Sequence, residues 1–125
     1  MKSEQITLST SLGTSDLRQV IGNATHGASI TDLETNSLSD PCAIAVLARW
    51  RPTFGERGDV QIYVYDEVNA RTIRLVALGA SLSDGLLMGF AKDMSDYVPM
   101  KASRKRLAKL VDALLAADPH AYEPD

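Results

Sequence analysis

The chain has little of the chemistry on which most catalytic and metal sites depend. Its 125 residues include one cysteine and two histidines. The single Cys42 excludes an intramolecular disulfide and a multi-cysteine metal site, and its apolar surroundings, "CAIAVLA", are typical of a buried strand. Neither His26 nor His120 has a second histidine at helical spacing. We therefore expect no metal site and no cofactor.

Long apolar runs and an excess of positive charge are absent as well. No segment approaches the roughly 18 apolar residues of a membrane-spanning helix. The polar start, "MKSEQITLST", lacks the apolar core of a secretory signal. The formal net charge of −3 argues against a general attraction to nucleic acids or anionic membranes. These features predict a soluble, cytoplasmic protein that does not bind membranes.

One glycine-rich stretch, "LGASLSDGLLMGF" at residues 78–90, invites comparison with two catalytic loops and fits neither. A phosphate-binding loop has four residues between its glycines and then lysine, whereas five residues separate Gly79 from Gly85 and Leu86 follows. A serine nucleophile turn would need glycine at the position of Ser83. The stretch is more typical of a hairpin connection, and we expect the protein not to be an enzyme.

The pattern of apolar residues predicts several half-buried strands and two helices. Alternating patterns cover residues 4–12, 42–52, 59–67, 71–78 and 85–90, and residues 28–41 form an edge strand or a loop. Helical spacing begins at Thr14 or Ser15, which would cap the helix, and stops at Gly27. A linker over 93–103 leads to the second helix, whose apolar stripe precedes Pro119 and comprises Leu107, Leu110, Val111, Leu114 and Leu115.

This element order, β-α-β-β-β-β-α, predicts one two-layer α+β domain over residues 1–118. The short, turn-rich connections favour an antiparallel meander of four to six strands, with both helices on one face. Residues 119–125 are expected to be a flexible C-terminal tail.

The uncovered face of that sheet is the first candidate binding surface. In the hairpin of residues 42–52 and 59–67, a pairing of Trp50 with Ile62 would set Arg49 opposite Tyr63 and Arg51 opposite Gln61. In the next hairpin, of residues 59–67 and 71–78, a four-residue turn would set Tyr65 opposite Arg74 and Tyr63 opposite Val76. An error in register would change the pairs but leave the side chains on one face. The alternative to a binding role is cation–π pairing on a wet surface. The candidate partner-binding residues are Arg49, Arg51, Tyr63, Tyr65 and Arg74.

The start of the last helix is the second candidate. Five of the thirteen basic residues lie within nine positions, where the helix dipole disfavours positive charge. An anionic partner would explain them, and solvation or pairing within the chain is the plainer alternative. Arg104, Arg106 and Lys109 do not share one face of a helix, which argues against a single phosphate-tracking groove. The candidate anion-contacting residues are Lys101, Arg104, Lys105, Arg106 and Lys109.

These features favour a small, non-enzymatic protein-interaction module, an adaptor or regulator, which binds a protein partner or a second copy of itself as a homodimer. The alternative is a single-stranded nucleic-acid-binding protein that uses the same face and the basic helix start. A third hypothesis is a small-ligand site between the sheet and the last helix. That site would be lined by Trp50, Met88, Phe90 and Leu114, residues that are equally typical of a core.

Overall fold

The computed structural model describes residues 2–33, 42–53, 57–66, 70–79 and 98–124. The strand expected at 85–90, the hairpin connection before it, and Met88 and Phe90 lie outside these ranges. The elements follow the order β1 (Lys2–Thr10), α1 (Thr14–Ala24), β2 (Ser29–Asp32), β3 (Cys42–Trp50), β4 (Gly58–Asp66), β5 (Arg71–Gly79) and α3 (Met100–Ala117). The predicted element order of the α+β fold is thereby confirmed.

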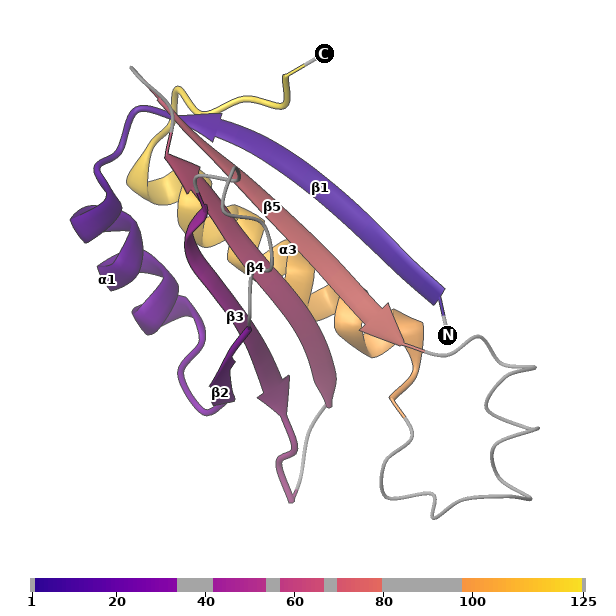
Figure 1. The fold of residues 1–125 in the computed structure, drawn as a ribbon. Coiled ribbons are helices and arrows are strands. Elements are labelled where there is room, and N and C mark those ends of the chain that lie inside the picture. Colours follow the sequence, from indigo (N-terminus) through magenta and orange to yellow (C-terminus); the bar gives the residue numbers. More distant parts are fainter. Residues whose placement is uncertain (1, 34–41, 54–56, 67–69, 80–97, 125) are drawn as a thin grey trace.

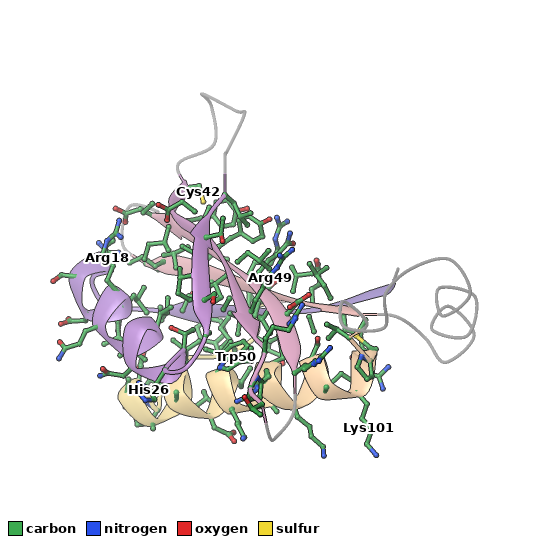
Figure 2. The ribbon with its side chains drawn as sticks, turned by 90° about the horizontal axis from the view of Figure 1, so that it is seen from below. Arg18, His26, Cys42, Arg49, Trp50 and Lys101 are labelled. Carbon is green, nitrogen blue, oxygen red and sulfur yellow. The ribbon has the colours of Figure 1, made fainter. Side chains whose placement is uncertain are left out.

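The five strands form one antiparallel sheet in the order β1-β5-β4-β3-β2. Strands β2 to β5 follow one another as the expected meander, and β1 returns to pair with β5 at the far edge. Both helices lie on the same side of the sheet, with α3 along β4 and β5 and α1 near the β2 edge (Figures 1 and 2). No helix among the described residues is long and apolar enough to cross a bilayer.

Side chains that alternate along the strands form the core between the sheet and the helices. Every strand except β2 contributes a buried row, and α1 and α3 contribute one stripe each. The strand rows comprise Leu8, Ile44, Ala48, Trp50, Val60, Ile62, Val64, Ile73, Leu75 and Ala77, and the helix stripes comprise Leu17, Ile21, Leu107, Leu110 and Leu114. These are the faces that the alternating and helical patterns predicted.

Neither helix begins with a side-chain cap, although the sequence favoured one for α1. Helix α1 has Gly13 at its N-cap and α3 has Pro99, and neither start has a side-chain cap hydrogen bond. The prediction of Thr14 or Ser15 as cap was therefore wrong by one or two residues, and the expected linker extended too far because residues 100–103 form the first turn of α3. The predicted stop at Gly27 agrees with its φ of 84°, which favours glycine.

The registers of the two central hairpins differ from the expected ones. Trp50 pairs with Gly58 and not with Ile62, a shift of four residues, because the last residue of β3 and the first residue of β4 already pair with each other. In the β4–β5 hairpin the four-residue connection lies one position earlier, after Asp66, which shifts that pairing by two residues. Both shifts are even, so residues 44–50 of β3 and the residues of β4 and β5 keep their expected faces, whereas a bulge between Cys42 and Ile44 pairs Cys42 with Tyr65.

The N-terminal half of α3 lies very close to one end of the sheet. A Cβ atom added to Gly79 would lie 2.7 Å from the backbone nitrogen and Cα of Met100. The fully buried Ser103 accepts a hydrogen bond from the Asp59 amide at 3.0 Å and donates one to the Leu78 carbonyl at 2.5 Å. Because Asp59 and Leu78 are cross-strand partners, this single hydroxyl joins β4, β5 and α3.

We predict that Gly79→Ala destabilises the fold. The new methyl group meets backbone, which yields less easily than a side chain, so the free energy of unfolding should fall by about 1–3 kcal/mol. Gly22→Ala is the matched control, because its Cβ would meet nothing within 4 Å on an exposed helical position. That control should gain about 0.5–1 kcal/mol. Urea unfolding of the two variants measures both values, and equal stabilities would contradict the close approach of α3 to β5.

Candidate functional site

The face of the sheet that is turned away from both helices is the main candidate surface. We call it the open face. Figure 2 shows the alternation that produces it: Trp50 points to the α3 side and Arg49 to the other. The open face of the three inner strands comprises Ala45, Leu47, Arg49, Asp59, Gln61, Tyr63, Tyr65, Thr72, Arg74, Val76 and Leu78.

A cluster of two tyrosines and one arginine occupies the middle of the open face. The rings of Tyr63 and Tyr65 are stacked, with centroids 6.4 Å apart and planes 19° apart. The guanidinium carbon of Arg74 lies 4.8 Å from the Tyr63 centroid and 5.7 Å from that of Tyr65. Each cation–π contact of this kind contributes about 0.5–1 kcal/mol where it is exposed and more where water is excluded. The cluster is therefore held in place before any partner binds.

Cross-strand pairing explains how this cluster forms. Tyr63 is the direct partner of Arg74, and Tyr65 is the next residue on the same face of β4. The buried Nε of Arg74 has no hydrogen-bond acceptor in the structure. Among the described residues, both tyrosine rings contact this guanidinium. The expected pairs of Arg74 with Tyr65 and of Tyr63 with Val76 are wrong, but both tyrosines still contact this arginine.

The other two arginines predicted for this surface have different surroundings. Arg51 follows the end of β3 and binds Asp59 through two contacts, Nη1–Oδ1 at 2.8 Å and Nη2–Oδ2 at 3.1 Å. Its Nη1 also donates to the carbonyls of Trp50 and Gly58, so Arg51 closes the β3–β4 hairpin. Arg49 is exposed and lies opposite Asp59, not opposite Tyr63 as expected. The predicted pairing of Arg51 with Gln61 is also wrong, because Gln61 pairs with Leu47.

The arginines at the start of α3 are engaged with the sheet. Arg104 forms an ion pair with Glu4 on β1. Arg106 lies over the Trp50 ring, 4.9 Å from its centroid, and its stem packs on Gly58, where an added Cβ would come within 2.6 Å of Cγ. These two cations therefore have intramolecular roles, as the plainer alternative predicted.

The lysines of α3 lie on a different side of the helix. Lys101, Lys105 and Lys109 are all exposed, and their spacing of four residues places them along one side of the helix surface. Figure 2 shows Lys101 extending away from the sheet. No acidic residue lies in the first turn of α3 to offset the helix dipole. A cation in the first turn of a helix costs about 0.3–1 kcal/mol at low ionic strength, which applies to Lys101 but not to Lys105 or Lys109.

Among the described residues, pockets lie at two edges of the sheet. One, of about 160 Å³, lies between α1 and the β2–β3 edge and is mainly apolar, lined by Ile21, Ile30, Ile44 and Val46 among others. The other, of about 250 Å³, lies where the end of β1 meets the C-terminal segment, and its lining includes Ser9, Asp118, His120 and Tyr122.

The polar pocket is built around the buried carboxylate of Asp118 at the C-cap of α3. Its Oδ2 accepts a hydrogen bond from the Thr10 hydroxyl at 2.6 Å, and its Oδ1 accepts one from the His120 amide at 3.1 Å. The Thr10 hydrogen bond is the main reason why the pKa of Asp118 is lowered, with smaller contributions from the amides of His120 and Ser11. Tyr122 exchanges two backbone hydrogen bonds with Ser9, so this part of the C-terminal segment is paired with β1. The flexibility predicted for residues 119–125 stays a prediction.

The remaining expectations concern ligands within the fold. Trp50 and Leu114, proposed to line a site between the sheet and the last helix, are 4% and 2% exposed and belong to the core. The indole nitrogen of Trp50 donates to the His26 carbonyl. Among the residues that the structure describes, no group of three or more histidine, cysteine or acidic side chains is placed to hold a metal ion. Residues that sequence reasoning missed are Ser103 and Asp118, since neither belongs to a motif.

Comparison of the chain with protein-family models, with curated proteins and with solved structures found no match. Any functional assignment therefore depends on the chemistry of the surfaces described above.

We predict that Asp118→Asn lowers stability at neutral pH. The Asp118 carboxylate accepts three hydrogen bonds through its two oxygens, whereas an asparagine side chain has one acceptor oxygen. Because folding lowers the pKa of Asp118, its contribution is present above the unfolded pKa, at about 4, and is lost as the pH falls through the lower folded value. The melting temperatures of the variant and the parent should therefore converge below about pH 4. A gap that persists unchanged at pH 2 would contradict this role of the carboxylate.

Proposed function

We propose that this protein is a non-enzymatic protein-association module that binds a second copy of itself through the open face. The observation that carries the proposal is the cluster of Tyr63, Tyr65 and Arg74 in the middle of a sheet face on which neither helix lies. Tyrosine and arginine are, with tryptophan, enriched among the residues that dominate binding energy at protein interfaces.

The cluster is suited to binding because it is rigid. The side chains stand on β4 and β5, two of the three inner strands of the sheet, and each is partly buried by its neighbours. The cation–π contacts already restrict their rotamers, so little side-chain entropy remains to be lost when a partner binds. A guanidinium is also more weakly hydrated than an ammonium, which lowers the cost of covering Arg74.

The dimensions of the open face agree with a small stable dimer. Strands β1, β3, β4 and β5 each contain nine residues. At about 3.3 Å per residue and 4.8 Å between strands, the four strands present about 600 Å². Two copies would therefore bury about 1,200 Å², at the lower end of the range for specific interfaces.

The border of the open face also favours the approach of another sheet. On the edge strands, the residues turned to this side are uncharged: Gln5, Thr7 and Ser9 on β1, and Ser29 and Thr31 on β2. Among the described residues of the inner strands, Asp59 is the one carboxylate on this face, and Arg51 already binds it. A second copy would therefore cover few unpaired charges.

Single-stranded nucleic acid is the alternative occupant of this face. It is favoured by the aromatic rings and by the scarcity of carboxylates. Binding by stacking needs free ring faces, however, and the guanidinium of Arg74 already lies over both tyrosines. A base would have to displace Arg74 from both rings, which is why we favour a protein partner.

We predict that the double variant Tyr63→Ser/Tyr65→Ser weakens dimerisation. Light scattering over a concentration series should show the parent chain rising from 13.5 kDa to twice that mass. Loss of the two central anchors should raise the dissociation constant about thirtyfold or more, the effect of about 2 kcal/mol of lost binding energy. Thermal unfolding at concentrations where both proteins are monomeric should show a small difference.

Tyr122→Ser provides the matched control. This residue is a 61% exposed tyrosine near the C-terminus, and the contacts described for it are those of its backbone with Ser9. Its variant should dimerise like the parent. A parent chain that stays monomeric at millimolar concentration would overturn the proposal. Tyrosine-dependent binding of a labelled single-stranded RNA by a monomer would support the alternative instead.

A further inference from the structure

The pocket at the C-terminal end of α3 contains a buried negative charge. It has a volume of about 250 Å³ and lies where the end of β1 meets the segment that follows the helix (Figure 1). Asp118, the C-cap residue of α3, lines this pocket and is 8% exposed. The hydrogen bond from Thr10 lowers the pKa of its carboxyl group, and the amides of His120 and Ser11 lower it further, so the group is ionised at neutral pH.

The groups that hold this carboxylate in place are neutral. Oδ2 accepts hydrogen bonds from the Thr10 hydroxyl at 2.6 Å and from the Ser11 amide at 3.4 Å, and Oδ1 accepts one from the His120 amide at 3.1 Å. A carboxylate can accept about four hydrogen bonds, two at each oxygen, so Oδ1 retains the capacity for a further donor. The three hydrogen bonds therefore fix the position of the charge without neutralising it.

Among the described residues, the elements around Asp118 provide no cation that forms an ion pair with it. The last turn of α3 contains no basic residue, although the helix dipole favours a cation at that end. Arg71 lies opposite Thr10 in the β1–β5 ladder, but it forms an ion pair with Asp66 at 3.0 Å. The charge of His120 makes the smallest contribution to the lowered pKa of Asp118, and an ordinary histidine is largely uncharged at about pH 8. A cation from outside the chain would therefore meet a carboxylate that is not yet neutralised.

We propose that this pocket binds a primary ammonium group, with the Asp118 carboxylate as its counter-ion. An ammonium has three N–H donors, of which one would bond to Oδ1 of Asp118. Ser11 and Tyr122, which also line the pocket, have oxygen atoms that can accept the others. The positive charge would in addition interact favourably with the negative end of the α3 dipole. A water molecule occupies about 30 Å³ in the liquid, so the pocket has room for a short alkyl chain as well as the ammonium.

The geometry of the pocket favours an ammonium over other cations. Calcium and magnesium are usually held by several oxygen ligands, and among the described residues no group of three histidine, cysteine or acidic side chains is placed together. A guanidinium pairs best with both oxygens of a carboxylate in one plane, whereas both oxygens of Asp118 already accept hydrogen bonds. A compact ammonium needs only one of the remaining acceptor sites. None of the residues that line the pocket belongs to the cluster of Tyr63, Tyr65 and Arg74, so this inference does not rest on the proposed self-association.

A nuclear magnetic resonance titration of the isotope-labelled chain with n-butylamine tests the proposal. At about pH 8 this amine is protonated, as a lysine side chain is, and histidine is largely neutral. The amide signals of Ser11 and His120, both of which donate to Asp118, should shift until they saturate, with a dissociation constant of about 1 mM for so small a ligand. The uncharged n-butanol should cause no such shift. Tetramethylammonium should bind about tenfold more weakly or less, because it has the charge but no N–H donor.

The same titration with Nα-acetyl-lysine methylamide distinguishes two sources of the ammonium group. Binding as tight as that of n-butylamine would show that the pocket accepts a lysine side chain of a partner. Binding of n-butylamine alone would show that the ligand is a small free amine.

Variants of the lining assign the binding to this pocket, and the dispersion of the amide signals shows whether each is folded. Asp118→Asn should raise the dissociation constant of n-butylamine about tenfold or more, the effect of losing a charged hydrogen-bond acceptor. Asp112→Asn is the matched control, because it removes the same charge from an exposed position of the same helix, and its affinity should stay within about twofold of the parent. Ala70→Leu keeps the carboxylate and adds side-chain volume to the lining, so it should also weaken binding about tenfold or more.

The proposal would be overturned by a parent chain whose Ser11 and His120 signals do not respond to n-butylamine. Parent-like affinity in a folded Asp118→Asn or Ala70→Leu variant would overturn it as well. Binding of n-butanol or tetramethylammonium as tight as that of n-butylamine would also contradict it, because neither compound can form the charged hydrogen bond.

Discussion

The close attachment of α3 to one end of the sheet is the constraint on which the rest of the structure depends. Three features produce it: Gly79 lets the backbone of Met100 approach, Gly58 accepts the stem of Arg106, and the Ser103 hydroxyl bridges an amide of β4 and a carbonyl of β5. A larger residue at either glycine would separate the layers. Because the helix lies so close to the sheet, the short polar side chain of Ser103 reaches the backbone of both strands. A helix packed at a greater distance would need longer side chains to fill the space.

This attachment also decides what each basic residue of α3 does. The side that meets the sheet is within reach of Glu4 and Trp50, and arginine suits both contacts because its planar guanidinium forms ion pairs and lies flat on aromatic rings. The exposed side of the helix carries the lysines Lys101, Lys105 and Lys109 instead. A cluster that looks uniform along the chain is thus divided by the fold into a structural half and a solvent-facing half.

The difference between local patterns and contacts that join separate elements explains which parts of the fold and the site could be predicted from the sequence. Strand faces and helix stripes depend on local periodicity, so the rows through Ile62 and Leu110 were predictable. The pairing of Trp50 with Gly58 was not, because it depends on where a hairpin connection ends. The roles of Arg51 and Arg106 were also out of reach, since each depends on a contact between elements that no local pattern records. Ser103 has the same property: an isolated serine in a basic segment gives no sign of a buried bridge.

An even shift in register has a particular consequence for the open face. Because side chains alternate with a period of two, a displacement by two or four residues exchanges partners but never exchanges faces. The set of residues on a strand face is therefore a more reliable basis for a functional hypothesis than any pair within it. Tyr63 and Tyr65 illustrate this point, since the pairs expected for them were wrong and Arg74 still contacts both rings. The contact survives because one arginine on β5 reaches two successive outward positions of β4, so that the cluster tolerates either pairing. For a surface of this type, the set of side chains on the face determines which interactions are possible, and the register determines only which side chains contact one another.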